Sequence, residues 1–472
     1  MIKSKILILF VLCSCPLLFY SCIDFSYHDG VTNTFWAMNF KTNRNYQVTA
    51  ELRVEGRYCN IWTELRSGVT DSQARQMAYV YDTLIYGRMM EAFGVSFNVI
   101  IDGETRVLNT MEYSGWLVNG DGKLCILLLN IIDDFEIGVN DSYIAGYFWG
   151  GDFLDINRSN RRSMIYIDTN PGMERINEAY STLAHEMQHL MNFVTSIGKR
   201  TENQYINIMD TWIDEGLSSA AEWVFSNEHL QHRIDWFNNN GRDNNMSGLI
   251  DQGNNFFIWG NRRNESIYAV LDDYATVYLF FQWLRLQADD NSDIYRKIIS
   301  SPYSDYRAVT SVMNEIAAGH DYSEWEVLLR TWLAANCINA DSGPYGYQND
   351  PQLKEIQIPS ASSISPVAAL FPGEGVYSFA GTKPDLSGQG VNIRNVFLTE
   401  TVMNTFQSGS VMLTYNINTN GSGPAETGVT TGVTVSSGKK LIPAGRSINA
   451  PVTWTGPWRI DAGDFLRQKE EQ

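Results

Sequence analysis

The alternation of apolar and polar residues predicts strands near the N-terminus and a helix directly after them. Apolar side chains occupy every second position from residue 48 to 54, and a second apolar run covers residues 58–65. This pattern is typical of a hairpin or small sheet within residues 24–65. Apolar residues then recur every three to four positions over residues 71–94, which predicts a helix capped by Asp71 and stopped by Gly94. Its predicted buried face consists of Met77, Val80, Tyr81, Leu84, Ile85 and Met89.

The middle of the chain predicts two buried strands followed by several helices. Residues 123–132 form an apolar run typical of a strand buried on both faces, and residues 163–169 predict another strand. Helical spacing predicts a long helix over 174–197, closed by Gly198 and buried along one side. Further helices are expected at 212–225, 272–286 and 322–337. The mixture indicates an α+β fold.

The composition changes near residue 343. Residues 343–375 hold five prolines and a serine-rich patch, which predicts a linker or long connection. Residues 376–472 are rich in Thr, Val, Ser and Gly with short alternating runs, which predicts a C-terminal all-β, sandwich-like module.

The N-terminus has the form of an export signal. Lys3 and Lys5 precede an apolar run of about 15 residues, shorter than the ~20 that a spanning helix needs. A small residue followed by Cys22 at its end resembles a bacterial lipobox. We therefore expect a lipoprotein-type signal peptide at residues 1–21 and a lipid anchor on Cys22 at the cell surface or a bacterial membrane. Cys15 is a rival lipid site, and ordinary cleavage with secretion is the alternative.

The net charge and the cysteine count limit the binding partners, the disulfides and the kinds of metal site that this protein can have. A formal charge of −18 disfavours nucleic acid or an anionic membrane as a partner held by charge. Cys59, Cys125 and Cys337 are too few for a disulfide framework, although one disulfide is possible, and no CxxC pair suggests a cysteine-based metal site.

The strongest chemical motif lies in the long helix over 174–197. It reads His185-Glu186-Met187-Gln188-His189. Histidines four positions apart share one face of a helix, so both imidazoles can reach one ion, and Zn²⁺ suits such neutral nitrogen ligands. Glu186 lies about 100° round the helix from His185. Its carboxylate can therefore take a proton from a water that zinc activates and pass it to a leaving amine.

A zinc site needs a third ligand. A third histidine six residues after His189 would supply one, but that position is Thr195. Glu215 instead begins a second helix soon after the first, where a carboxylate can complete a His₂Glu site. Glu222, two turns further on, is a candidate to orient a ligand imidazole. His229 and His232 are rival ligands, although they stand among polar residues beyond that helix.

These residues resemble the hyicolysin-type zinc metallopeptidases and, more distantly, the gluzincins, including thermolysin and aminopeptidase N-like enzymes. The resemblance rests on residues 185–193 and 212–222, extends weakly to 146–152 and 165–168, and covers roughly residues 51–332. It implies a gluzincin-type peptidase domain with a mixed sheet and active-site helices. Asp214 stands where many gluzincins have Asn, which would alter hydrogen bonding around the ligands.

The resemblance also implies a donor that steadies the oxyanion. Tyr274, near the start of the predicted helix 272–286, matches the transition-state tyrosine of the aminopeptidase-like enzymes. The alternative is that Tyr274 or Tyr278 is simply a packed side chain. By analogy of fold, the strand at 163–169 would be the rim strand along which an extended peptide lies.

The sequence therefore predicts an exported, lipid-anchored zinc metallopeptidase acting on proteins or peptides. Its parts would be a region at 22–110 leading into the peptidase domain, the domain itself at 111–342, and the linker and module described above. No motif resembles the amine-binding motif of aminopeptidases, which favours an endopeptidase. Two alternatives stay open: a surface binding protein of the same fold with little or no turnover, and a zinc hydrolase acting on another bond.

Overall fold

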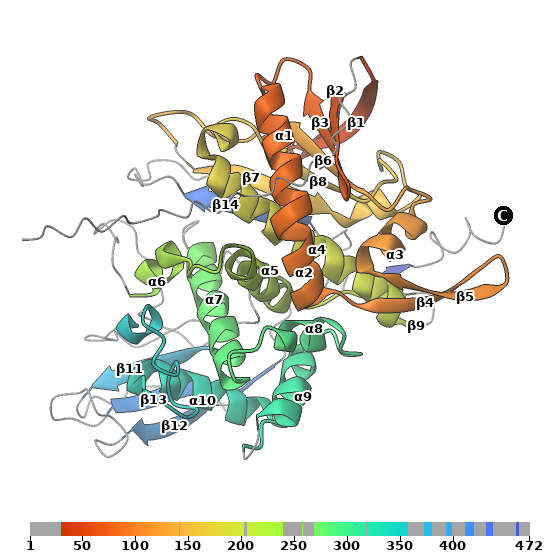
Figure 1. Cartoon of the computed structure of the whole chain (residues 1–472). Helices are drawn as coiled ribbons and strands as arrows, with labels where there is room; N and C mark the ends of the chain where they lie inside the picture. Colours follow the sequence, from red (N-terminus) through yellow and green to blue (C-terminus); the bar gives the residue numbers. More distant parts are fainter. Residues whose placement is uncertain are drawn as a thin grey trace, which may run out of the picture.

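A mixed, seven-stranded sheet forms the framework of the molecule (Figure 1). The computed structural model describes residues 30–140, 142–202, 205–238, 257, 269–317, 320–356, 372–379, 393–398, 411–419, 431–437 and 459–461. The strand order is β1-β2-β3-β6-β8-β7-β14. In chain order these are β1 (Thr32–Asn39), β2 (Arg44–Glu55), β3 (Cys59–Glu64), β6 (Leu124–Leu129), β7 (Ser142–Trp149), β8 (Met164–Asp168) and β14 (Thr431–Ser437).

Three neighbouring strands at the centre of this sheet are parallel. β3 pairs with β6 and β6 pairs with β8 in parallel, whereas the outer strands pair antiparallel. All six residues of β6 are buried, as its continuous apolar run predicted. Ile126 and Leu128 face the main core, and Leu127 and Leu129 face a smaller core on the opposite side. The α+β class is therefore confirmed.

The expectation that residues 163–169 form a rim strand is wrong. β8 pairs with β6 on one side and with β7 on the other, so it offers no free edge to a peptide. The sequence could not indicate that β8 is an inner strand. β7 precedes β8 in the chain, yet in the sheet β7 lies on the side of β8 that faces away from β6. The described edges of the sheet are β1 and β14.

The predicted helix over 71–94 is interrupted by a wider turn. α1 (Asp71–Val80) and α2 (Tyr86–Phe93) are joined by a π-helical segment at Tyr81–Ile85. The cap is Thr70, whose side chain forms a capping box with Gln73, rather than Asp71. Gly94 ends α2 as expected. Because a π turn adds a residue, it changes which face points inward, and Leu84 is 41% exposed instead of buried.

The long helix α4 (Ile176–Lys199) lies between the sheet and the other helices (Figure 1). It is buried on all sides over most of its length, not along one side, because the sheet covers one face and α5 (Thr211–Ser226) covers another. Gly198 does not stop it. A Cβ atom at Gly198 would lie 2.4 Å from the ring of Phe97, so this glycine permits close packing within the last turn.

The remaining elements surround this centre. β4 and β5 form a hairpin that projects from the body in Figure 1, and α8, α9 and α10 lie below α5 in that view. Their bounds are β4 (Ser96–Ile101), β5 (Glu104–Asn109), α3 (Thr110–Leu117), β9 (Thr201–Glu202), β10 (Tyr205–Asn207), α6 (Gln231–Phe237), α7 (Ala269–Gln287), α8 (Asp293–Ile299), α9 (Tyr306–Ile316) and α10 (Trp325–Ile338). Within the described residues no helix combines the length and apolar composition that crossing a membrane would require.

The described parts of residues 376–472 are strands. β11 (Gly375–Phe379), β13 (Val411–Asn416) and β12 (Ile393–Leu398) form a small sheet beside α10. β14 joins the edge of the main sheet at β7, and β15 (Arg459–Asp461) pairs with β10. The sandwich and the domain boundaries stay predictions, and the signal peptide with Cys15 and Cys22 lies outside the described residues. Cys59, Cys125 and Cys337 are buried, and no disulfide joins them to one another or to another described cysteine.

A buried carboxyl group ties the loop after β7 to the sheet. Asp152 is fully buried and accepts hydrogen bonds from the Tyr166 hydroxyl at 2.6 Å and the Asn160 amide at 2.7 Å. Burial outweighs these hydrogen bonds and raises the pKa of Asp152 to about 7. Since the folded chain holds this proton more tightly than the unfolded chain (pKa about 3.9), the stability that Asp152 contributes should fall as the pH rises from about 4 to about 7.

We expect the Asp152 contribution to the free energy of unfolding to decrease over that range by a few kcal/mol. Denaturant titration of metal-free protein across the range measures the effect, and Asp152→Asn should make the profile less steep because the amide does not titrate. Asp155→Asn, a change at a nearby exposed carboxylate, is the matched control. Parallel profiles for the wild type and Asp152→Asn would contradict the prediction.

Candidate metal centre

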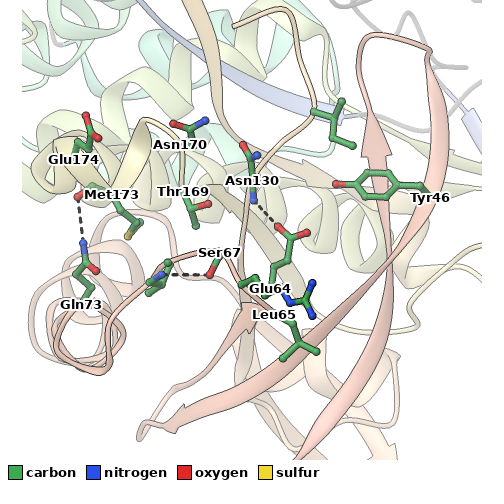
Figure 2. A pocket seen from close by; sticks show the side chains of 14 residues that line it. Tyr46, Glu64, Leu65, Ser67, Gln73, Asn130, Thr169, Asn170, Met173 and Glu174 are labelled. Carbon is green, nitrogen blue, oxygen red and sulfur yellow. Dashed lines mark hydrogen bonds between the residues drawn. The ribbon is translucent and has the colours of Figure 1, made fainter. Parts of the chain in front are cut away.

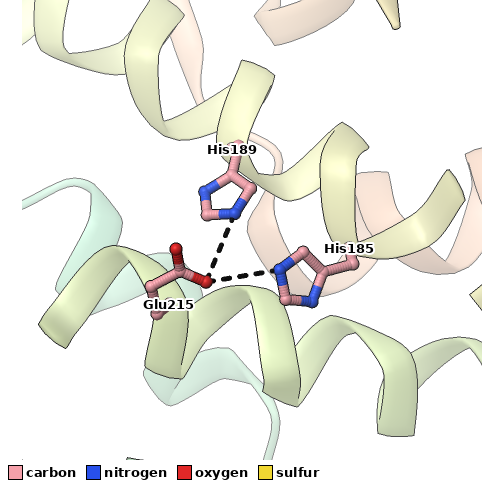
Figure 3. A group of neighbouring side chains, drawn as sticks. All are labelled: His185, His189 and Glu215. Carbon is pink, nitrogen blue, oxygen red and sulfur yellow. Dashed lines mark ion pairs between the residues drawn. The ribbon is translucent and has the colours of Figure 1, made fainter. Parts of the chain in front are cut away.

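Two histidines and a glutamate from neighbouring helices converge on one point (Figure 3). His185 and His189 lie one turn apart on α4, and Glu215 comes from the first turns of α5. Oε2 of Glu215 lies 3.4 Å from Nε2 of His185 and 3.6 Å from Nε2 of His189. All three side chains are buried. The structure thus brings together the three residues that the sequence predicted as ligands.

The geometry of these three atoms fits a zinc ion. At a tetrahedral ion with bonds of about 2.0–2.1 Å, two ligand atoms lie roughly 3.4 Å apart. The two imidazole Nε2 atoms and Oε2 of Glu215 are buried and make no hydrogen bond. Buried polar atoms without hydrogen bonds are costly, and a shared cation would satisfy all three at once.

The other nitrogen of each imidazole is held by a carboxylate. Nδ1 of His185 lies 2.9 Å from Oε1 of Glu222, and Nδ1 of His189 lies 2.8 Å from Oδ2 of Asp214. A proton on each Nδ1 satisfies these carboxylates and leaves the Nε2 lone pairs directed at the common point. Glu222 therefore lies where the sequence predicted an orienting group, and Asp214 performs the same task for the second histidine.

A row of hydrogen-bonded polar side chains continues beyond Asp214 and holds its carboxylate in place. No local sequence pattern predicts these hydrogen bonds. The Asn192 side-chain amide donates to Oδ1 of Asp214, and Nη2 of Arg200 donates to Oδ1 of Asn192 at 3.0 Å. Arg200 also donates to the carbonyls of Ile299 and Ser301, at 2.7 and 3.1 Å, which anchors the chain of contacts to a distant loop. Only the position of Asn192, three residues after His189 on α4, could have hinted at this role.

The charges of the site suit a cation. Burial alone would lower the pKa of His185, but the neighbouring carboxylates of Glu215 and Glu222 outweigh burial and raise this pKa to about 9. For His189 burial is likewise outweighed by the charges of Asp214 and Glu215, and its pKa is raised well above the usual value. Burial would raise the pKa of Glu215, yet the two histidines lower it to about 2. The carboxylates thus stabilise positive charge, whether from protons or a metal.

Glu186 and Tyr274 lie beside the cluster. Glu186 follows His185 on α4 and is fully buried. Tyr274 is 2% exposed, and its ring centroid lies 6.4 Å from that of His185. Burial, then the charge of Glu215 and, to a lesser extent, that of Glu186 raise the pKa of Tyr274 well above the usual value. The phenol therefore keeps its proton near neutral pH and can donate it in a hydrogen bond.

Arg233 is a further residue of the site that no local sequence pattern predicts. It lies on α6, is 5% exposed, and holds its guanidinium carbon 4.4 Å from the ring centroid of Tyr274. Such a cation–π contact restrains the ring, and the positive charge partly offsets the rise in the pKa of Tyr274, which makes its hydroxyl a stronger hydrogen-bond donor. Nothing in the local sequence distinguishes this arginine from a surface one. α7 also begins at Ala269, so Tyr274 lies in its second turn rather than at its start.

Several other predicted features have different surroundings. Nδ1 of His229 lies 2.7 Å from the Tyr278 hydroxyl and Nε2 lies 3.0 Å from Asp350, while His232 is exposed on α6; neither belongs to the metal cluster. On α5, a Cβ atom at Gly216 would lie 2.3 Å from the ring of Phe281 on α7. This glycine therefore allows α5 and α7 to pack closely.

Comparison with known proteins agrees with this chemistry. The chain is similar to the neutral metalloprotease ShpI of Staphylococcus hyicus, with 29% identity over 362 residues that span 74% of this chain and 72% of the relative. The similarity supports a metallopeptidase. No family model matches the chain.

Proposed function

We propose that this chain is an exported zinc endopeptidase of the gluzincin type, in which His185, His189 and Glu215 bind Zn²⁺. The observation that carries the proposal is the convergence of three buried ligand atoms at separations of 3.4 and 3.6 Å, each free of any hydrogen bond. The similarity to a neutral metalloprotease supports a peptide or protein as the substrate.

In the proposed mechanism a Zn²⁺ ion held by His185, His189 and Glu215 would act as a Lewis acid and would lower the pKa of a water toward neutrality. Glu186 then accepts a proton from that water and later gives it to the leaving amine. Tyr274 donates a hydrogen bond to the oxygen on which negative charge develops. Glu222 and Asp214 keep the two imidazoles oriented, and Arg233 holds the Tyr274 ring in place.

Zinc analysis and casein cleavage by the purified chain from Ile23 onward test the proposal. We expect about one zinc per chain, cleavage that stops on removal of zinc by a chelator, and recovery when zinc is restored. Zinc bound at about one per chain without cleavage of any peptide would favour the surface binding protein with little or no turnover. Cleavage that persists without zinc would contradict the mechanism.

Tyr274→Phe should lower kcat about 100- to 1,000-fold with little change in KM or zinc content, because it removes one donor to the developing oxyanion. Steady-state kinetics on a fluorogenic peptide measure the effect. Tyr278→Phe is the matched control on the same helix, since its hydroxyl is engaged by His229 and the amide of Leu230. That control should lower thermal stability while kcat stays near wild type. Equal kcat values for Tyr274→Phe and the wild type would remove Tyr274 from the mechanism.

The proposed export and lipid anchor rest on the N-terminal sequence alone. Metabolic labelling with a radioactive fatty acid would detect the anchor, and Cys22→Ser should abolish the label whereas Cys15→Ser should leave it. Label lost only in Cys15→Ser would place the lipid on the rival cysteine instead.

A further inference from the structure

A second polar cavity lies where the three parallel strands of the sheet end (Figure 2). Its volume is about 700 Å³, and it lies beyond the carboxyl ends of β3, β6 and β8, with the start of α1 along one wall. None of its lining residues belongs to the metal centre. The carboxyl ends of parallel strands are a common place for ligand binding, and this volume falls in the range of small-molecule sites.

Two hydroxyl groups in this cavity are buried without a hydrogen-bond partner. They are Oγ1 of Thr169, in a residue only 7% exposed, and the phenolic oxygen of Tyr46. The Thr169 amide donates to the carbonyl of Leu129 at 2.9 Å, which holds the residue at the strand end. In Figure 2 the Tyr46 hydroxyl points toward Glu64 and Asn130 from one side, and Thr169 lies on the other side of these two residues. Buried hydroxyls normally have partners, so these two indicate a ligand that supplies hydrogen bonds.

The charges around the cavity argue against an anionic ligand. Its charged lining residues are Glu64, Arg66 and Glu174, which sum to −1. Glu64 accepts a hydrogen bond from the backbone amide of Asn130 at 2.9 Å, and its carboxylate would repel an anion. A metal ion is not favoured either, because among the described residues the grouping of three metal-ligating side chains occurs at His185, His189 and Glu215.

The remaining polar groups suit a ligand whose atoms both donate and accept hydrogen bonds. The hydroxyls of Tyr46 and Thr169 can both donate and accept hydrogen bonds, whereas the carboxylate of Glu64 only accepts them. The side-chain amides of Asn130 and Asn170 each offer an NH₂ group as donor and a carbonyl oxygen as acceptor. Neighbouring hydroxyls of a sugar can donate to the carboxylate and accept from the buried hydroxyls at the same time. We propose that this cavity binds a neutral saccharide unit, a function separate from peptide hydrolysis.

Binding of free sugars to the purified chain tests the proposal without any need for peptidase activity. The probes are glucose, galactose, mannose and N-acetylglucosamine, measured by saturation-transfer NMR and then by calorimetry. We expect at least one to bind, and Thr169→Val and Tyr46→Phe each to weaken it about 3- to 10-fold, the effect of losing one hydrogen bond. Thr105→Val and Tyr79→Phe, at exposed positions, are the matched controls and should bind as the wild type does.

Three results would overturn the proposal. One is that none of the four sugars binds, and another is that binding is unchanged in both Thr169→Val and Tyr46→Phe although circular dichroism shows them folded. The third is preferential binding of a small amine such as ethanolamine, which would make this a cation subsite. Because zinc content and casein cleavage are measured separately, failure here leaves the proposed peptidase intact, and the reverse also holds.

Discussion

Glu186→Gln is expected to lower kcat for peptide cleavage by about 100- to 10,000-fold while zinc content stays at about one per chain. Glutamine keeps the size of the side chain but cannot accept the proton that the attacking water must lose. Glu186 is buried beside the His185–Glu215 cluster and is not one of its three converging ligands, so the metal should still bind. Zinc analysis and steady-state kinetics on the same preparations measure the two effects.

Glu178→Gln provides the control for this substitution. Glu178 lies on the same helix two turns earlier, with its side chain 52% exposed, so the same chemical change there should leave kcat unchanged. If Glu186→Gln cleaved casein at the wild-type rate, Glu186 would not be the base. If it lost zinc as well, its main role would be in metal binding rather than in proton transfer.

Glu215→Gln is expected to lower zinc affinity by more than the 10- to 100-fold that Glu222→Gln should cause. Glu215 contributes the oxygen nearest both ligand nitrogens, and its loss removes the negative charge from the point where the metal would bind. Glu222 contacts only the outer nitrogen of His185, so its loss should disturb the orientation of one ligand without removing any. Competition with a zinc chelator measures the affinity of each variant.

Glu228→Gln is the control for this series, because Glu228 is exposed just beyond α5. The expected order of zinc affinity is wild type and Glu228→Gln, then Glu222→Gln, then Glu215→Gln. Equal affinity of Glu215→Gln and the wild type would rule out Glu215 as a ligand, and a rival donor would then have to be found outside the cluster.

Local patterns made the inner part of the site predictable. The spacing of His185 and His189 needs only a regular helix to place both rings on one face, and Glu215 needs only a second helix beside it. Asp214 and Glu222 could also be predicted from the sequence, because both are acidic residues on the helix that carries Glu215. Tyr274 was inferred from a family resemblance, and the structure places its ring beside His185.

Other features depended on contacts between distant parts of the chain. Arg233 packs on Tyr274 from a different helix, and Arg200 reaches the Asn192–Asp214 pair through side-chain geometry that no periodicity encodes. The position of β8 inside the sheet depends on where β7 pairs, and the cavity with Thr169 and Tyr46 depends on strands far apart in the sequence.

The sequence by itself determined the helix that carries His185 and His189, the buried strand β6 and the α+β class, because helix and strand periodicities follow from local backbone geometry. The tertiary structure decided which carboxylate contacts which imidazole, which strands form the edges of the sheet, and which buried hydroxyls line the cavity at the strand ends. These features depend on the packing of whole elements against one another, so no local pattern records them.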